Sequence, residues 1–241
     1  MLRFSDARNF GRTITGLLLF AAPALLLIAT VIQPNTDHKS KMQELNAIAA
    51  HKGTYLLGGI LFMVGGLFIV FAGAALIKLF RGPRGITAGQ VGGALLMCAG
   101  FITAGWYALG AVEYEMVNHS GLDRQALANF LHKADSPASF IPMILLFMVG
   151  IVIGSILVAV ANWRTRLAPV WASVAIIVGG LISAVASGKA ANAASLAVLL
   201  IGLGAIGMRV LAMTDEEWDA PRERAVTPPE ASSPPAPQPA S

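Results

Sequence analysis

Six runs of apolar residues, each long enough to cross a lipid bilayer as a helix, divide the chain. A hydrocarbon core roughly 30 Å thick takes about 20 helical residues to cross. Polar residues separate the runs. They cover residues 13–33, 54–79, 87–112, 138–162, 169–188 and 192–213. The pattern predicts an all-α membrane protein with six transmembrane helices.

The first run has the position of a secretory signal peptide, since Arg3, Arg8 and Arg12 precede it. Its apolar part extends from Ile14 to Ile32, however, whereas the apolar region of a signal peptide is about 7–15 residues long. No small-residue cleavage site follows it. We interpret this run as a retained transmembrane anchor.

Two polar stretches between the runs have the pattern of short amphipathic helices. In the first, Ser40 and Gln43 have the spacing of a helix-capping box. The apolar stripes are Met42, Leu45 and Ile48 or Ala49 in the first stretch, and Leu122, Ala126 and Phe130 in the second. We expect each helix to lie at the membrane interface, with its stripe on lipid or on the rim of the helix bundle.

The composition agrees with a membrane protein. Hydrophobic residues make up 56% of the 241 residues and charged residues 12%, whereas about a quarter of the residues of a soluble domain are charged. Cys98 is the only cysteine, so no cysteine cluster suggests a zinc or redox centre, and we expect no cofactor. Aromatic residues near the ends of the runs suit interfacial belts: Trp106, Tyr107, Tyr114, Trp163 and Trp171.

Basic residues indicate which side of the membrane is cytoplasmic. Eleven of the 17 lysines and arginines fall on the side of the two termini and of the short turns RGPRG and NWRTR, and six fall on the other side. Short loops rich in Lys and Arg stay in the cytoplasm. The pattern therefore predicts cytoplasmic termini, with segments 34–53 and 113–137 outside. No basic patch interleaved with aromatic residues points to nucleic acid.

An internal repeat is indicated by the pentapeptide LFMVG, which occurs at residues 61–65 and 146–150. Arg81 and Arg166 keep the same offset of 85 residues, and each polar stretch contains two histidines separated by 12 residues. We interpret outer segment, helix, basic turn and helix as one unit present twice. The two units cover residues 38–112 and 119–188. Both enter the membrane from the same side, so the repeat is parallel, with a pseudo-two-fold axis along the membrane normal.

The duplicated stretches hold all four histidines of the chain, His38, His51, His119 and His132. One interpretation is that histidines of the two units converge to bind a divalent metal or to sense external pH. The other is that His51 and His132 interact with the dipole at the end of a helix, while His38 and His119 are polar turn residues. Because two histidines of one stretch would lie about 20 Å apart along a helix, a metal site requires both units.

The middle of every run lacks Asp, Glu, Lys, Arg and His. Ionisable residues at that depth mark proton relays and paths for charged substrates, so their absence argues against a proton-coupled transporter and against a b-type haem protein. Four polar residues in the runs are more typical of hydrogen bonds between helices: Gln90, Thr103, Asn162 and Ser183. For a membrane enzyme that acts on lipid head groups, the only plausible acid/base cluster in the sequence is Glu113, Glu115 and His119. No nucleophile or metal signature accompanies this cluster, so an enzyme is the least favoured function.

Glycines recur at helical spacing within the runs. They are Gly59, Gly66 and Gly73 in the second run, Gly85, Gly89 and Gly93 at the start of the third, and Gly150 and Gly154 in the fourth. Small residues let helix backbones approach closely where lipid competes for every apolar contact. We interpret them as packing seams inside one bundle rather than as a surface for homodimerisation.

The end of the chain changes in character. The charged stretch TDEEWDAPRER is expected to extend the last helix briefly along the cytoplasmic surface, and the proline-rich stretch after it has too little apolar surface to fold. The pattern predicts one transmembrane domain over residues 1–213 and a disordered, Pro-rich cytoplasmic tail over residues 214–241.

Three stretches carry a resemblance to known proteins: AAHKG, LIKLFRGPRG and NWRTRLAPVWA. They resemble the small six-helix integral membrane proteins of unknown function that abound in GC-rich bacteria, over most of residues 10–213. The resemblance implies this fold and topology in a bacterial plasma membrane. It implies no activity and no site residue.

These observations favour a non-enzymatic membrane protein whose helix bundle supports an assembly or binds a partner protein or a lipid. The expected partners are the bilayer itself and a second membrane protein or a second copy of the chain. The alternative is a transporter, or an extracytoplasmic metal or pH sensor, that uses the duplicated histidines. A bundle of this kind supports many roles, so the fold alone does not decide between them.

Overall fold

Helices account for all the regular structure that the computed structural model describes, which covers residues 7–35, 40–80, 85–119, 121, 123–134, 137–185 and 187–218. The helices are α1 (Ala7–Ile32), α2 (Lys41–Ala50), α3 (Lys52–Leu79), α4 (Ile86–Asn118), α5 (Arg124–Ala134), α6 (Pro137–Met148), α7 (Gly154–Thr165), α8 (Val170–Val185) and α9 (Lys189–Leu211). A five-residue π-helix, η1 (Val149–Ile153), joins α6 to α7 without a break. The predicted all-α class is confirmed.

Within the described residues, five helical segments are long and apolar enough to cross a membrane. They are Asn9–Ile32, Lys52–Leu79, Ile86–Asn118, Phe140–Thr165 and Lys189–Leu211. The sixth predicted span corresponds to α8, which is apolar but has only 16 residues and is therefore about 24 Å long. Pro169 precedes α8, and Gly188 after it has a φ of 95°, a conformation that favours glycine.

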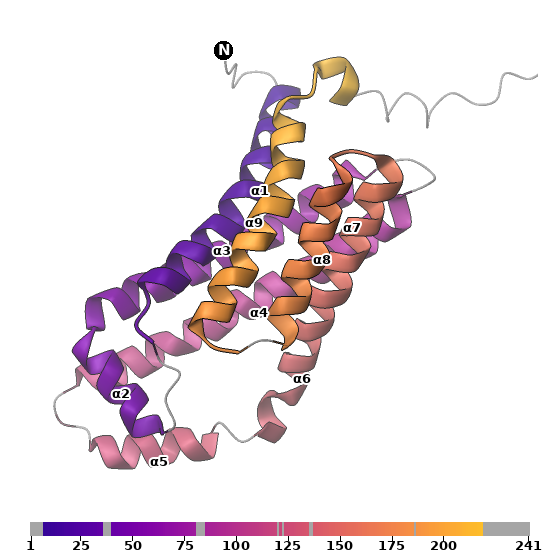
Figure 1. Ribbon diagram of the computed structural model, residues 1–241. Coiled ribbons are helices and arrows are strands. Elements are labelled where there is room, and N and C mark those ends of the chain that lie inside the picture. Colours follow the sequence, from indigo (N-terminus) through magenta and orange to yellow (C-terminus); the bar gives the residue numbers. More distant parts are fainter. Residues whose placement is uncertain are drawn as a thin grey trace, which may run out of the picture.

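The long helices and α8 form a closed ring in which each packs on two neighbours. Around the ring, α1 packs on α3, α3 on α4, α4 on α7, α7 on α8, α8 on α9, and α9 returns to α1. The beginning of α1 and the end of α9 lie at one end of the ring, and α2 and α5 lie at the other (Figure 1). The first and last helices of the bundle are thus neighbours.

Glycines allow the close contacts of the ring, as the sequence predicted. Gly73 of α3 and Gly93 of α4 face each other, and a Cβ on either would lie within 2.7 Å of the other's carbonyl oxygen. Gly150 of η1 packs equally closely against α4, because a Cβ there would lie 2.8 Å from the carbonyl oxygen of Leu95. Gly59 is the exception, with nothing within 4 Å of its Cβ position, so it belongs to no seam in the described residues.

Polar side chains reinforce two of the helix pairs. Asn162 of α7 is fully buried; its Nδ2 donates to Ser173 Oγ of α8 at 2.8 Å and its Oδ1 accepts from the Ala168 backbone N–H at 2.9 Å. Ser195 Oγ of α9 donates to the Gly179 carbonyl oxygen of α8 at 2.8 Å and also contacts Ser183 Oγ. The prediction of hydrogen bonds between helices is confirmed for Asn162 and Ser183, but Thr103 donates within α4 and Gln90 is exposed.

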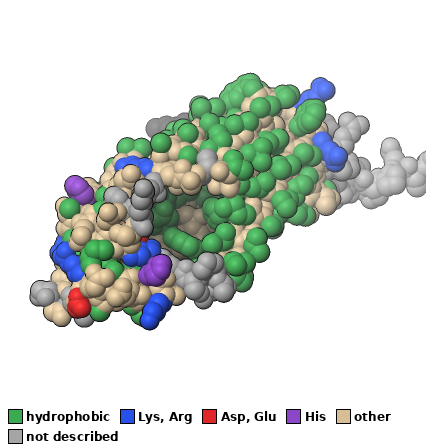
Figure 2. All heavy atoms as spheres, turned by 60° about the horizontal axis from the view of Figure 1, so that its bottom comes forward, with side chains coloured by type: hydrophobic (Ala, Val, Ile, Leu, Met, Phe, Trp, Pro, Cys, Tyr) green, Lys and Arg blue, Asp and Glu red, His purple; other side chains and the backbone are tan. Residues whose placement is uncertain are grey.

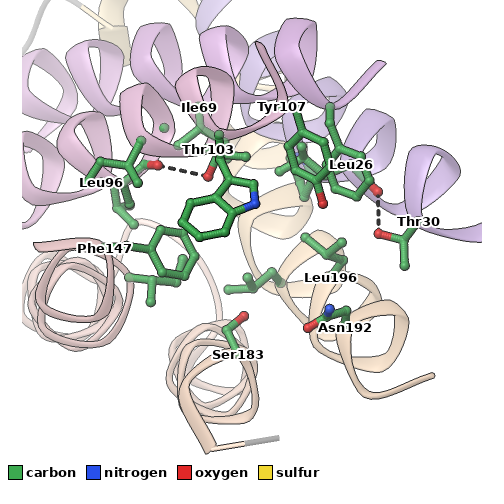
Figure 3. Close-up of a pocket in the computed structure, with 18 of the residues that line it drawn as sticks. Leu26, Thr30, Ile69, Leu96, Thr103, Tyr107, Phe147, Ser183, Asn192 and Leu196 are labelled. Atoms are coloured by element: carbon green, nitrogen blue, oxygen red, sulfur yellow. Dashed lines mark hydrogen bonds between the residues drawn. The ribbon is translucent and has the colours of Figure 1, made fainter. Parts of the chain in front are cut away.

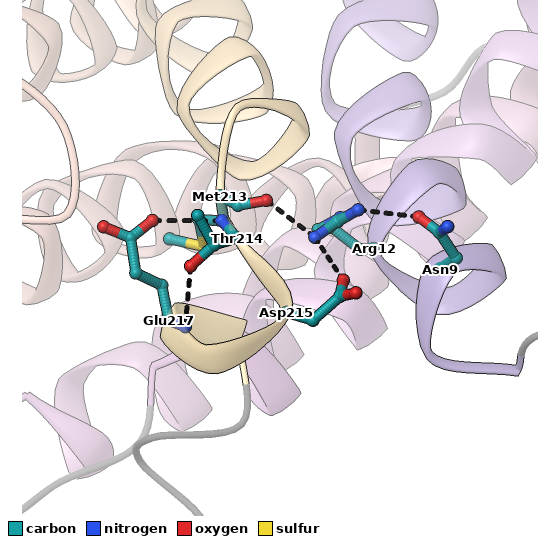
Figure 4. Close-up of polar contacts among 6 residues, drawn as sticks. All are labelled: Asn9, Arg12, Met213, Thr214, Asp215 and Glu217. Atoms are coloured by element: carbon teal, nitrogen blue, oxygen red, sulfur yellow. Dashed lines mark hydrogen bonds and ion pairs between the residues drawn. The ribbon is translucent and has the colours of Figure 1, made fainter. Parts of the chain in front are cut away.

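An ionic contact fastens the start of α1 to the segment after α9 (Figure 4). The Arg12 guanidinium donates to the carbonyl oxygen of Met213 at 2.6 Å and to Asp215 Oδ1 at 2.7 Å. Residues 215–218 form a short helical turn, which Thr214 and Glu217 begin by exchanging backbone-to-side-chain hydrogen bonds at 3.2 Å, as in a capping box. The predicted Pro-rich tail lies outside the described residues from position 219 onwards.

The two short helices α2 and α5 pack against each other at one end of the bundle. Ser40 caps α2, since its Oγ accepts from the Gln43 backbone N–H at 3.3 Å, and Leu45 and Ile48 are buried. Both features of α2 follow the prediction. In α5, Phe130 of the predicted stripe is 59% exposed, as a residue that faces lipid would be, whereas Ala128 and Leu131 face α2. Leu122 of that stripe lies outside the described residues.

The two proposed repeat units both consist of a short helix followed by two apolar helices, but the ring does not relate them by a half-turn. In the ring order, α7 and α8 follow directly after α3 and α4, and α1 and α9 fill the remaining arc. The second unit is therefore displaced by two places in a ring of six helices. The predicted pseudo-two-fold axis is not found in the contacts of the described residues.

Candidate functional site

The ring encloses a cavity of about 390 Å³, which is within the range of small-molecule sites. Figure 2 shows the hollow at the end of the molecule that carries α2 and α5, with hydrophobic side chains around it. Residues from α1, α3, α4, α6, η1, α7, α8 and α9 line the cavity. The site is therefore a product of the whole ring and not of one helix pair.

Apolar side chains line the deep part of the cavity, halfway along the ring helices. They include Pro23, Ile69, Leu96, Ile176, Leu199 and Leu203. Five helices contribute to this floor, so each of them supplies only one or two side chains. An apolar floor of this kind favours an apolar guest, because burying its surface removes it from water or from a polar head-group layer.

Aromatic side chains stand nearer the end that carries α2 and α5. The rings of Phe62 and Tyr107 are stacked, with centroids 3.7 Å apart and planes within 2°. Trp106 of α4 meets Phe140 of α6 with ring centroids 5.5 Å apart and planes inclined by 58°. Phe147 of α6 projects into the same space (Figure 3). The rings of Phe62, Trp106, Tyr107 and Phe147 form an apolar wall around the outer half of the cavity.

Hydroxyl groups in the cavity wall donate to their own helices. Thr30 Oγ1 donates to the Leu26 carbonyl oxygen and Thr103 Oγ1 to the Ala99 carbonyl oxygen, both at 2.9 Å (Figure 3). A threonine that donates backwards in this way satisfies its proton inside the helix. Its oxygen is left only as a weak acceptor toward a guest.

Other polar groups of the wall have no such partner. Tyr107 and Asn192 face the same part of the cavity from α4 and α9 (Figure 3). The Tyr107 hydroxyl, the Asn192 amide and the Trp106 indole N–H make no hydrogen bond with any residue that the structure describes. Neutral donors and acceptors that face a cavity without a partner are available to a bound molecule.

Lys189 carries the only formal charge among the described residues that line the cavity. Its Nζ donates to the carbonyl oxygens of Val31 at 2.9 Å and Gln33 at 2.6 Å. These carbonyls belong to the C-terminal end of α1, where a cation is favoured by the helix dipole and by the unpaired carbonyl groups. The charge of Lys189 is therefore used to join α9 to α1.

Ser155 lies beside the cavity floor and is unusual among the buried polar residues. It is fully buried, and its Oγ has no hydrogen-bond partner within the described part of the chain. A helical serine normally donates to the carbonyl four residues earlier, which for Ser155 is Ile151, inside the π-helix. The missing bond thus falls where the α-helical hydrogen-bond register gives way to that of a π-turn.

The structure places the predicted histidines apart from this cavity. His51 ends α2, His119 ends α4 and His132 lies in the last turn of α5, and all three are exposed; His38 lies outside the described residues. Within the part of the chain that the structure describes, no group of three His, Cys, Asp or Glu side chains is placed to hold a metal ion. The four-histidine metal site stays a prediction.

The predicted acid/base cluster is divided between two places. Glu113 Oε2 accepts a hydrogen bond from the Tyr55 hydroxyl at 2.9 Å, between α4 and α3. Glu115 lies one turn away from His119, with Oε2 3.8 Å from Nδ1, and both side chains are mostly exposed. Neither group lines the ring cavity.

Sequence reasoning found some of the cavity residues and missed others. Thr103 and Ser183 stood out as polar residues within apolar runs. Trp106 and Tyr107 were assigned to an interfacial belt, and Asn192 was not singled out although it is a polar residue at the start of an apolar run. One sequence signal would have found this site. It is a polar residue one helical turn inside an apolar run, at the same membrane depth as aromatic residues of another run.

The chain belongs to the family described as a domain of unknown function, DUF4386, which matches residues 14–213. The match extends over all the ring helices, and it agrees with the resemblance to membrane proteins of unknown function. No curated protein and no solved structure matches the chain.

Proposed function

We propose that this protein is a non-enzymatic membrane protein that binds a lipid or a lipid-like molecule in the cavity of its helix ring. The observation that carries the proposal is the division of the cavity wall. Apolar side chains line the deep part, whereas the unpartnered polar groups of Tyr107, Trp106 and Asn192 lie nearer one end. An amphiphile has the same division between its chain and its head.

The topology that we propose has six membrane spans, with α8 as the shortest. The termini of the described chain lie at the same end of the ring (Figure 1), as an even number of crossings requires. With the basic turns and both termini in the cytoplasm, the polar end of the cavity faces the outer leaflet. A reporter fused after Arg166 should read as cytoplasmic, and an external reading would reverse the orientation.

The internal repeat remains part of this proposal. The order of one short helix and two apolar helices occurs twice, and the two short helices, α2 and α5, pack on each other. We propose that the units arose by duplication and then took unequal positions when α1 and α9 closed the ring.

Quenching of tryptophan fluorescence tests the lipid-binding proposal. In a variant that keeps Trp106 and has Phe at positions 163, 171 and 218, lipids with brominated chains should quench the fluorescence saturably. The lipids should include uncharged, anionic and zwitterionic heads, so that the test does not depend on the head. Unbrominated lipid should reverse the quenching.

The matched control keeps Trp171 alone, on the outer face of α8, where it is 54% exposed against 44% for Trp106. Detergent-dissolved lipid should quench Trp171 weakly and in proportion to its concentration. If all the lipids quench the two tryptophans in parallel, the cavity does not hold lipid and the proposal is wrong.

The packing of α2 on α5 supports a second candidate, an outer metal or pH sensor or a transporter that uses the histidines. This contact brings together the two stretches that carry them. Titration with zinc or nickel tests it with the wild type, the His51→Ala/His132→Ala variant and the His38→Ala/His119→Ala variant. Tight binding that one double variant loses would support a site, and no binding by the wild type would reject it.

A further inference from the structure

We infer that the cavity selects amphiphiles with an uncharged, hydrogen-bonding head group, such as a hydroxyl or an ester. This inference rests on the proposed function and specifies the class of molecule that the site takes. It depends on three observations: the charges in the cavity wall, the partners of those charges, and the neutral groups that remain.

A cationic head would find no counter-ion in the described wall. The described lining residues include no Asp, Glu or other acidic side chain apart from the tyrosine hydroxyl. Moving a charged group from water into a largely apolar site without a partner is costly. The described wall offers an ammonium head only the faces of its aromatic rings, and no carboxylate to neutralise its charge.

An anionic head would have to compete for Lys189. The Nζ of Lys189 is held by the carbonyl oxygens of Val31 and Gln33 at 2.9 and 2.6 Å, and it has further interactions as well. To bind a phosphate or carboxylate, Lys189 would have to leave the C-terminal end of α1, where the carbonyls would lose their partner. The wall offers no second cation among the described residues.

Neutral partners are present and are placed for one head group. The Tyr107 hydroxyl and the Asn192 amide come from α4 and α9 and face the same space (Figure 3). A tyrosine hydroxyl and an amide can each donate and accept, so together they match an alcohol, which also does both, or an ester carbonyl. The apolar floor beyond them then takes the chain.

A series of amphiphiles with the same C16 chain tests the inference in the variant that keeps Trp106 alone. The head groups are glycerol (in a monoacylglycerol), phosphoglycerol, phosphocholine and trimethylammonium. Each amphiphile competes with a brominated lipid for the cavity. The monoacylglycerol should bind at least about tenfold more tightly than the charged members, which corresponds to about 1.4 kcal/mol. A preference for any charged head, or equal affinity for all, overturns the inference while the proposed function stands.

Two variants connect the preference to the named groups. Tyr107→Phe removes one hydroxyl and keeps the ring that stacks on Phe62, so it should lower monoacylglycerol affinity several-fold and leave the other heads unchanged. Tyr114→Phe is the matched control, since Tyr114 does not line this cavity. Unchanged selectivity in Tyr107→Phe and in Asn192→Ala would contradict the inference. If no brominated lipid quenches Trp106 saturably and no amphiphile displaces one, the proposed function itself is overturned.

Discussion

Gly66 of α3 and Gly100 of α4 face each other across the most extensive helix–helix contact of the ring. A Cβ on Gly66 would lie 2.9 Å from the carbonyl oxygen of Gly100, and a Cβ on Gly100 would lie 2.7 Å from the carbonyl oxygen of Gly66. Both contacts are with backbone, which has no rotamer with which to move away. The close approach of α3 and α4 therefore depends on the absence of methyl groups at this pair, as it does at Gly73 and Gly93.

Gly66→Ala should separate α3 from α4 and destabilise the protein by about 1–3 kcal/mol, as expected for overpacking. The thermal midpoint of unfolding in detergent measures the effect. Gly59→Ala is the matched control on the same helix, because nothing lies within 4 Å of its Cβ position. It should be neutral or stabilising, since alanine is the better helix former. Equal losses in both variants would show that the α3–α4 contact does not set the stability.

The glycine seams show what the sequence could predict. Long apolar runs and small residues at helical spacing are properties of one helix, so the sequence located α3 and its seam residues Gly66 and Gly73. The capping box of Ser40 is equally local. In α5, however, an apolar residue at every fourth position does not show whether that face is buried or exposed. Phe130 fits the spacing and is exposed, and only the contact with α2 determines that Ala128 and Leu131 face inward.

The cavity could not be predicted because each helix supplies only a few side chains to it. Tyr107 and Asn192 are 85 residues apart, the difference of their numbers, and they share a space only because α9 returns to α1 and closes the ring. The π-helix is similarly hidden, since the residues Val149–Ile153 would suit an ordinary α-helix. A single sequence does not specify such contacts between distant segments.

Asn162 should be the most sensitive polar residue of the bundle. Replacement by leucine keeps a similar volume but leaves the Ala168 backbone N–H, which is bound by Asn162 Oδ1 at 2.9 Å, buried without a partner. We expect a loss of about 2 kcal/mol or more, because a buried unsatisfied group costs its full desolvation. Unfolding in detergent measures it against Gln90→Leu, where the side chain is exposed. A larger loss in the Gln90 variant would contradict the prediction.

Arg12→Gln should loosen the segment after α9 without opening the ring. The side chain of Arg12 is 15% exposed and that of Asp215 59%, so the pair is partly screened and its loss should cost about 1 kcal/mol. Asp215→Asn should cost less, because the bond from Arg12 to the Met213 carbonyl remains. Limited proteolysis after α9 should be faster in Arg12→Gln than in Asp215→Asn. The reverse order would show that the carboxylate, not the carbonyl, is the main partner.

Ser155 and Ser173 are two buried serines that should respond to alanine in opposite ways. Ser173 Oγ accepts from Asn162 Nδ2 at 2.8 Å, whereas Ser155 Oγ has no partner among the described residues. Ser173→Ala should therefore lose about 1 kcal/mol of stability, while Ser155→Ala should lose none and gain up to about 1 kcal/mol, since a buried hydroxyl without a bond is replaced by an apolar group. Detergent unfolding of the two variants measures this difference directly. A loss in Ser155→Ala as large as that in Ser173→Ala would mean that the hydroxyl is satisfied in the purified protein, by a water molecule or by the guest of the adjacent cavity. Repeating the measurement on lipid-stripped protein separates these two cases, because only a bond to the guest disappears when the lipid is removed.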